Sequence, residues 1–147
     1  MYYSFFEFLE IIVKSCKHHT EYLQKTVIIF GEIKKQGKEM QRDAMLKQLG
    51  YIPNDALIEQ LKIIETNTSG YEKIQKHIMD LHDSLKVNGS FVALSNSVNS
   101  FKIKVEAPSV EMAEEAHMKV EHFSEKFKVT VKKLENKDTY YIIGFYH

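Results

Sequence analysis

The chain has 147 residues, of which 44% are apolar and 27% are charged, and its 20 basic and 20 acidic side chains cancel at neutral pH. This length and composition are typical of a folded protein with one core or with two cores in contact, and they favour a folded chain over a disordered one. A net charge of zero gives no overall field that would attract nucleic acid or an anionic membrane, although it is compatible with a local basic patch.

The N-terminal segment is rich in apolar and aromatic residues, yet it predicts neither a signal peptide nor a membrane span. Glu7 and Glu10 lie inside it, no early Lys or Arg is present, and its apolar run is shorter than the roughly 20 residues that a spanning helix needs. Cys16 is the only cysteine, so the chain cannot form an internal disulfide or a thiolate metal cluster. We therefore expect a cytoplasmic protein that does not enter a membrane.

The first predicted element is a long amphipathic helix. Apolar residues recur at steps of three and four from Phe5 to Phe30, which is the spacing of one helical face. Gly31 and Gly37 then weaken the pattern, and we expect a break there before a second helix that carries Met40 to Leu49.

Two further helices are predicted within the first 87 residues. Gly50 is placed to end the second helix, and Asn54 is a candidate N-cap for the third, whose apolar residues run from Leu57 to Ile64. The segment from Tyr71 to Leu85 shows the same spacing and predicts a fourth helix. Short polar turns between helices favour antiparallel packing.

From residue 88 the pattern becomes that of a small sheet. Phe101 to Val105 alternates apolar and basic residues, which predicts a half-buried strand, and residues 91–94 form a shorter apolar run that can pair with it. Ser109 is a candidate N-cap for a helix that ends near Phe127. Residues 129–134 and 139–146 are rich in β-formers and predict a hairpin.

The predicted fold class is therefore α+β. About four antiparallel helices in residues 1–87 precede a small (β)βαββ antiparallel-sheet module in residues 88–147, and we expect the two regions to pack together as one unit. One helix on a small sheet leaves the second face and the edges uncovered. The cover has to come from the N-terminal helices or from a second copy of the chain.

The first candidate site is a homo-oligomer interface on the first helix. The aromatic-rich start of this helix has more apolar surface than one neighbour can cover, and large exposed apolar patches usually mark interfaces. The residues assigned to this interface are Tyr2, Tyr3, Phe5, Phe6, Phe8 and Leu9. The sequence thus favours a non-catalytic interaction or assembly protein whose partners are copies of itself or another protein.

An alternative function is nucleic-acid binding on the outer face of the sheet. Lys102 and Lys104 alternate with apolar residues on one predicted strand, and Lys128 and Lys132 do so near the next. With Tyr140 they form a lysine-rich face that carries an aromatic ring, as single-strand binders use. Lysines also alternate with apolar residues on ordinary half-exposed strands, where they prevent aggregation at sheet edges.

A further alternative is a small-ligand or metal-dependent enzyme with a pocket between the helices and the sheet. Glu114, His117 and Glu121 lie at steps of three and four on one helical face, a pattern that suits metal ligands. No second Glu-x-x-His completes a dinuclear site, and His117 falls on the inward stripe, where a hydrogen-bonded structural histidine is more frequent. We therefore expect no metal, no other cofactor and no catalytic residue.

Two shorter pairs are interpreted structurally. His82-Asp83 resembles the His-Asp pair that holds metal in one phosphohydrolase class, but a dipeptide is not specific, and we interpret it as charge on a helix surface. Cys16 and His19, three residues apart, could form a thiolate-imidazole pair. Both lie on the buried stripe, where a cysteine behaves as a small apolar residue.

Overall fold

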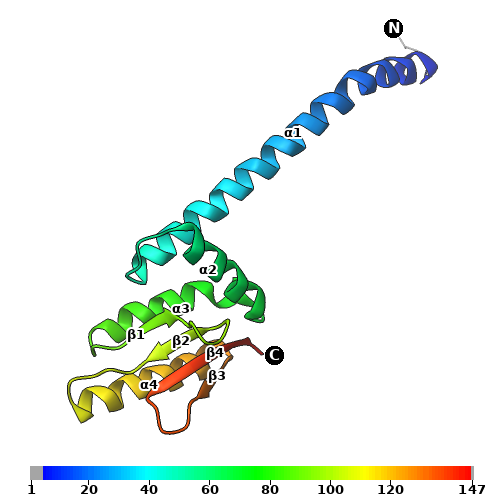
Figure 1. Cartoon of the computed structure of the whole chain (residues 1–147). Helices are drawn as coiled ribbons and strands as arrows, with labels where there is room; N and C mark the ends of the chain where they lie inside the picture. Colours follow the sequence, from blue (N-terminus) through cyan, green and yellow to red (C-terminus); the bar gives the residue numbers. More distant parts are fainter. Residues whose placement is uncertain (1–4, 147) are drawn as a thin grey trace. The chain divides into compact units, whose positions relative to one another are not determined.

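In the residues that the structure describes, three helices precede a sheet of four antiparallel strands. A fourth helix follows the second strand in the chain and precedes the third (Figure 1). The structure, a computed structural model, describes residues 5–146, with side chains from residue 23 onward. The elements are α1 (Phe5–Gln48), α2 (Asp55–Asn67), α3 (Tyr71–Lys86), β1 (Phe91–Leu94), β2 (Phe101–Lys104), α4 (Val110–Phe127), β3 (Val129–Lys133) and β4 (Thr139–Phe145). The α+β class is confirmed. The chain divides into two units, Met1–Gln41 and Arg42–His147.

Helix α1 runs without a break through Gly31 and Gly37, so the predicted end of one helix and start of another is wrong. A glycine inside a helix costs about 1 kcal/mol relative to alanine, which weakens the helix but does not end it. Neither glycine has the positive φ of a helix terminator, and no proline follows within the helix. Within residues 5–146, three helices, instead of about four, therefore precede the sheet.

The predicted helix caps are confirmed. Gly50 has a φ of 90° just after α1, and the Tyr51 N–H donates to the Leu46 carbonyl oxygen at 2.9 Å, as in a Schellman turn. Asn54 and Ser109 are the N-caps of α2 and α4, because each side chain accepts a hydrogen bond from the N–H three residues further on. Local chemistry therefore sets these helix ends.

The sheet has the strand order β1-β2-β4-β3, and each neighbouring pair is antiparallel. This arrangement confirms the (β)βαββ module, including its short first strand and its final hairpin. Alternation along β2 separates two faces, since Phe101 and Ile103 are fully buried whereas Lys102 and Lys104 are partly exposed. We call the side that carries the two lysines the open face.

The other face of the sheet packs on α3 and α4. Ile78 and Leu85 of α3, Val120 of α4 and Ile142 of β4 belong to one buried cluster with the inward residues of β2. The end of α1 and one face of α2 add to the same core, to which they contribute Leu46, Leu61 and Ile64. The Arg42–His147 unit therefore contains helices and sheet around one continuous core.

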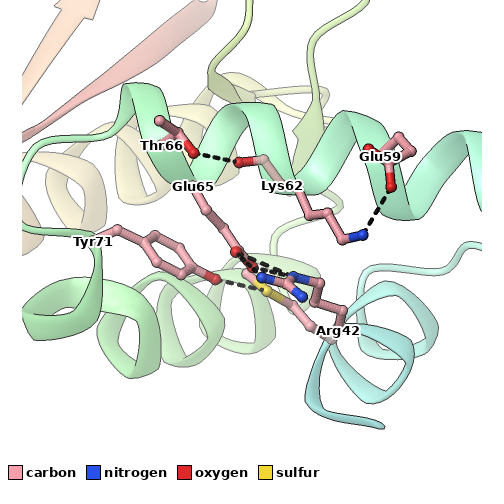
Figure 2. Close-up of polar contacts among 7 residues, drawn as sticks. Arg42, Glu59, Lys62, Glu65, Thr66 and Tyr71 are labelled. Atoms are coloured by element: carbon pink, nitrogen blue, oxygen red, sulfur yellow. Dashed lines mark hydrogen bonds and ion pairs between the residues drawn. The ribbon is translucent and has the colours of Figure 1, made fainter. Parts of the chain in front are cut away.

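Polar contacts join the last turns of α1 to α2 and α3 (Figure 2). Arg42 Nη2 and Nε donate to Glu65 Oε2 at 2.9 and 3.2 Å, and the two side chains are only 17% and 16% exposed. The Tyr71 hydroxyl donates to Met45 Sδ at 3.2 Å, and burial, followed by the nearby Glu65 carboxylate, raises the pKa of this phenol. The bidentate pair of Arg42 and Glu65 fixes the orientation of the last turns of α1 on α2 as well as their distance.

His82 lies in the core, so its interpretation as surface charge is wrong, although Asp83 is exposed. The ring is 2% exposed, and its Nδ1 accepts a hydrogen bond from the Val92 N–H at 3.1 Å. Its Nε2 is buried without a hydrogen-bond partner among the described residues. Burial first, and then the Lys86 ammonium, lower the pKa of His82, so the folded protein holds the ring neutral.

The lowered pKa of His82 predicts that the protein loses stability on acidification. Below its ordinary pKa of 6.5 the unfolded chain takes up a proton that the folded chain refuses, so the free energy of unfolding falls as the pH drops. One proton limits the slope to about 1.4 kcal/mol per pH unit. Urea titrations between about pH 7 and pH 5 should show a shallower slope in His82→Asn than in the exposed control His122→Asn. Equal slopes in the two variants would contradict this role.

The Met1–Gln41 unit is formed by helix α1 over its described residues. Most of its side chains from Leu23 onward are exposed, and many of them are large and apolar. None of the helices within residues 5–146 combines the length and the apolar composition that crossing a bilayer requires.

Candidate site on the open face of the sheet

The open face carries a row of three side chains across neighbouring strands. Lys102 of β2 pairs with Tyr141 of β4, and Tyr141 pairs in turn with Lys132 of β3. Residues directly opposite one another in an antiparallel sheet project from the same face. The Tyr141 ring is therefore flanked by a lysine on each side. We call Lys102, Tyr141 and Lys132 the central row.

A groove of about 490 Å³ lies beside the central row. Ser95 and Ser97 from the β1–β2 loop line one part of it, Lys102, Thr139 and Tyr141 from the strands line its floor, and Lys137 comes from the β3–β4 hairpin. Four of these six side chains end in a hydroxyl group and two in an ammonium group. The ion pair of Lys104 with Glu106 and the carboxylate of Asp138 also line the groove. The groove can therefore donate several hydrogen bonds to an anionic or strongly polar ligand.

Hydrogen bonds order the hydroxyl groups of the groove. Ser97 Oγ lies 3.3 Å from the Tyr141 hydroxyl and 3.3 Å from Ser95 Oγ, which itself accepts from the Val98 N–H at 3.2 Å. The bond with Ser97 is the largest cause that lowers the pKa of Tyr141, and the charges of Lys102 and Lys137 act in the same direction. The phenol is thus held in place from the loop side.

The lysines of the open face differ in their partners. Lys104 Nζ lies 3.0 Å from Glu106 Oε1, so this ammonium is largely neutralised. Lys102, Lys132 and Lys137 have no ion pair within the described part of the chain. Three lysines without an ion-pair partner among the described residues therefore lie near Tyr141, and the carboxylates of Glu106 and Asp138 line the same groove.

Tyr140 and Lys128 were assigned to this face from the sequence, and neither belongs to the central row. Tyr140 pairs with Ile103, is buried on the helix-covered face, and its hydroxyl lies 2.6 Å from His117 Nδ1. The sequence alone does not decide which of the adjacent residues Tyr140 and Tyr141 lies on the open face. A shift of the strand register by one residue moves each side chain to the opposite face of the sheet. Lys128 has a φ of 53° at the end of α4, just before β3 begins.

Of the residues predicted for this face, the structure places Lys102, Lys104 and Lys132 there. It adds Tyr141, Ser97 and Lys137, which were not predicted from the sequence. The alternation of β4 carries a signal for Tyr141, because Tyr140, Ile142 and Gly144 are its buried positions. Ser97 and Lys137 lie on turns, and no sequence pattern brings those two turns together.

The metal candidates do not gather around a common point. Glu114 and Glu121 are exposed on α4, whereas His117 contacts Tyr140 and places its Nε2 3.4 Å from Asp138 Oδ1. Among the described residues, no three or more His, Cys, Asp or Glu side chains could hold a metal ion together. This environment is that of a hydrogen-bonded structural histidine.

The other assigned residues lie outside what the structure describes. Tyr2 and Tyr3 precede the described backbone, and the side chains of Phe5, Phe6, Phe8 and Leu9 are not described. The same holds for the side chains of Cys16 and His19. The interface assigned to the start of α1 and the thiolate-imidazole pair therefore stay predictions.

The geometry defines a class of protein: an α+β protein whose four-stranded antiparallel sheet has one helix-covered face and one open, lysine-bearing face. No protein-family model, no curated protein and no solved structure matches the chain.

Proposed function

We propose that this chain is a non-catalytic cytoplasmic assembly protein that forms a homo-oligomer through α1. The observation that carries the proposal is the apolar surface of the helix after residue 22. Six large apolar side chains on one side of the helix are each more than half exposed there: Leu23, Val27, Ile29, Phe30, Ile33 and Met40. Contiguous exposed apolar surface of this kind marks an interface.

The spacing of these side chains fits helix-to-helix association. Steps of three and four alternate strictly through Leu23, Thr26, Phe30, Ile33, Gly37 and Met40, which we call the seam. The same alternation extends back in the sequence to Phe5. Because α1 continues through both glycines, the whole repeat keeps one register on one helix. A repeat of 3.5 residues is the pattern of helices that pack side by side in a coiled coil.

The residues around the seam favour copies of the same helix as partners. Val27 and Ile29 flank the seam, whereas the charges of Lys25, Glu32 and Lys35 fall at the outward heptad positions. Identical helices place their apolar stripes at the same period, so each copy covers the seam of another along its full length. A stripe widened by flanking apolar residues is typical of bundles in which a helix has more than one neighbour.

Light scattering of the purified full-length chain tests this proposal. At tens of micromolar we expect a mass of at least twice the 17.2 kDa of one chain, falling toward one chain on dilution. A constant mass of 17.2 kDa over that concentration range would show that the seam is not an interface between copies.

A further inference from the structure

We propose that the central row and its groove bind single-stranded nucleic acid, with one base stacked on Tyr141 and the neighbouring phosphates held by Lys102 and Lys132. This function goes beyond assembly through α1 and uses a different surface. It depends on the register of three strands, which brings together residues that are distant in the sequence.

Tyr141 has the placement that a stacking platform needs. It lies on β4, one of the two central strands of the sheet, and its ring is partly exposed on the open face. The hydrogen bond between Ser97 and the phenol restricts the ring, so less side-chain freedom is lost when a base stacks on it. Every base has an aromatic face, so such a platform accepts a strand without reading its sequence.

The two lysines of the row are placed for a chain of phosphates that passes the ring on both sides. Neighbouring strands lie about 4.8 Å apart, so the Lys102 and Lys132 backbones are separated by about 10 Å, with Tyr141 midway. Neither ammonium has an ion-pair partner among the described residues, so no ion pair has to be broken before a phosphate binds. Lys137 adds a third charge at the hairpin end of the groove.

The groove supplies the remaining contacts. Its volume of about 490 Å³ lies within the range of pockets that hold molecules the size of a nucleotide. Ser97 and Thr139 line it and offer hydroxyl groups to phosphate oxygens, sugars or base edges, whereas Ser95 is buried and bonds to Ser97. A simple anion would use the lysines and the hydroxyls but not the ring. The contribution of the ring therefore separates a nucleic-acid strand from other anions.

Fluorescence anisotropy with a labelled oligothymidylate of about 15 nucleotides, a length in the range that one small binding domain covers, tests the proposal. We expect saturable binding at low salt that weakens steeply as salt is added. Tyr141→Ala should weaken binding by about 5- to 150-fold, the range for loss of one stacked base, whereas Tyr141→Phe should retain most of the affinity. An unlabelled duplex of the same length should compete poorly.

The contribution of the two lysine charges is tested with the double variant Lys102→Gln/Lys132→Gln. This variant should bind more weakly, and its slope of log affinity against log salt should be smaller by about 1.4, since each single-strand phosphate contact contributes about 0.7. The matched control is Lys47→Gln/Lys76→Gln, which removes the same charge from exposed positions on α1 and α3 and should bind as the parent does. Thermal unfolding of each variant verifies that the sheet is intact.

Three results would each overturn the proposal. The first is that the parent chain does not bind the oligonucleotide at low salt. The second is that Tyr141→Ala binds as tightly as the parent while the lysine variant does not, which would identify a general polyanion surface. The third is that duplex competes as well as single strand, because a stacking platform has no access to paired bases.

Discussion

Phe30→Asp is expected to reduce the assembly to single chains at concentrations where the parent chain is oligomeric. Phe30 lies in the middle of the seam and its side chain is 59% exposed in the single chain, so the assembly proposed above buries its ring between chains. Burying a side chain of this size contributes about 1.5–3 kcal/mol, or roughly a tenfold to a hundredfold change in the association constant. A carboxylate at a buried seam position adds the cost of removing a charge from water.

Ile28→Asp is the matched control for this substitution. Ile28 is 61% exposed, lies two residues away on the same helix, and acquires the same charge, but it is outside the seam. It should leave the mass measured by light scattering unchanged, while Ile33→Asp should act as Phe30→Asp does. If Ile28→Asp dissociates the chains as strongly as Phe30→Asp, then general apolar contact holds them together and the heptad register does not.

The parts of the fold that were predicted correctly depend on local chemistry. Asn54, Ser109 and Gly50 act on their own helix ends, so their effects can be read from neighbouring residues. Strand β2 is likewise visible as alternation, because one face of the sheet is buried by α3 and α4, whereas β1 is visible as a short apolar run.

The incorrect predictions concern features that are decided by a small energy difference or by contacts between residues distant in the sequence. Whether Gly31 breaks α1 is decided by a cost of about 1 kcal/mol against the propensity of its neighbours, which is too small a difference for a pattern to settle. The burial of His82 depends on β1, whose Val92 N–H donates to its ring. Tyr140 and Tyr141 exchange roles if the register shifts by one residue, and the pairings of β4 with β2 and β3 fix that register.

Gly144→Ala should destabilise the Arg42–His147 unit more than any surface substitution discussed above. Gly144 has a φ of 149°, and a Cβ atom there would lie 2.6 Å from the Ser69 nitrogen and 2.7 Å from its carbonyl oxygen. That carbonyl accepts a hydrogen bond from the Phe145 N–H at 2.7 Å, so the two backbones cannot separate without breaking it. Strain and overpacking each cost about 1–3 kcal/mol, so we expect a loss of about 2–6 kcal/mol in urea denaturation.

Gly50→Ala separates the two causes, because Gly50 has a φ of 90° but no atom within 4 Å of an added Cβ. This control should lose only the cost of placing a side chain at positive φ, about 1 kcal/mol. The difference between the two variants then measures the close approach of the α2–α3 turn to β4. Equal losses would mean that the Ser69 backbone yields freely. In that case the isolated bridge between Ser69 and Gly144 would not hold this turn against the sheet.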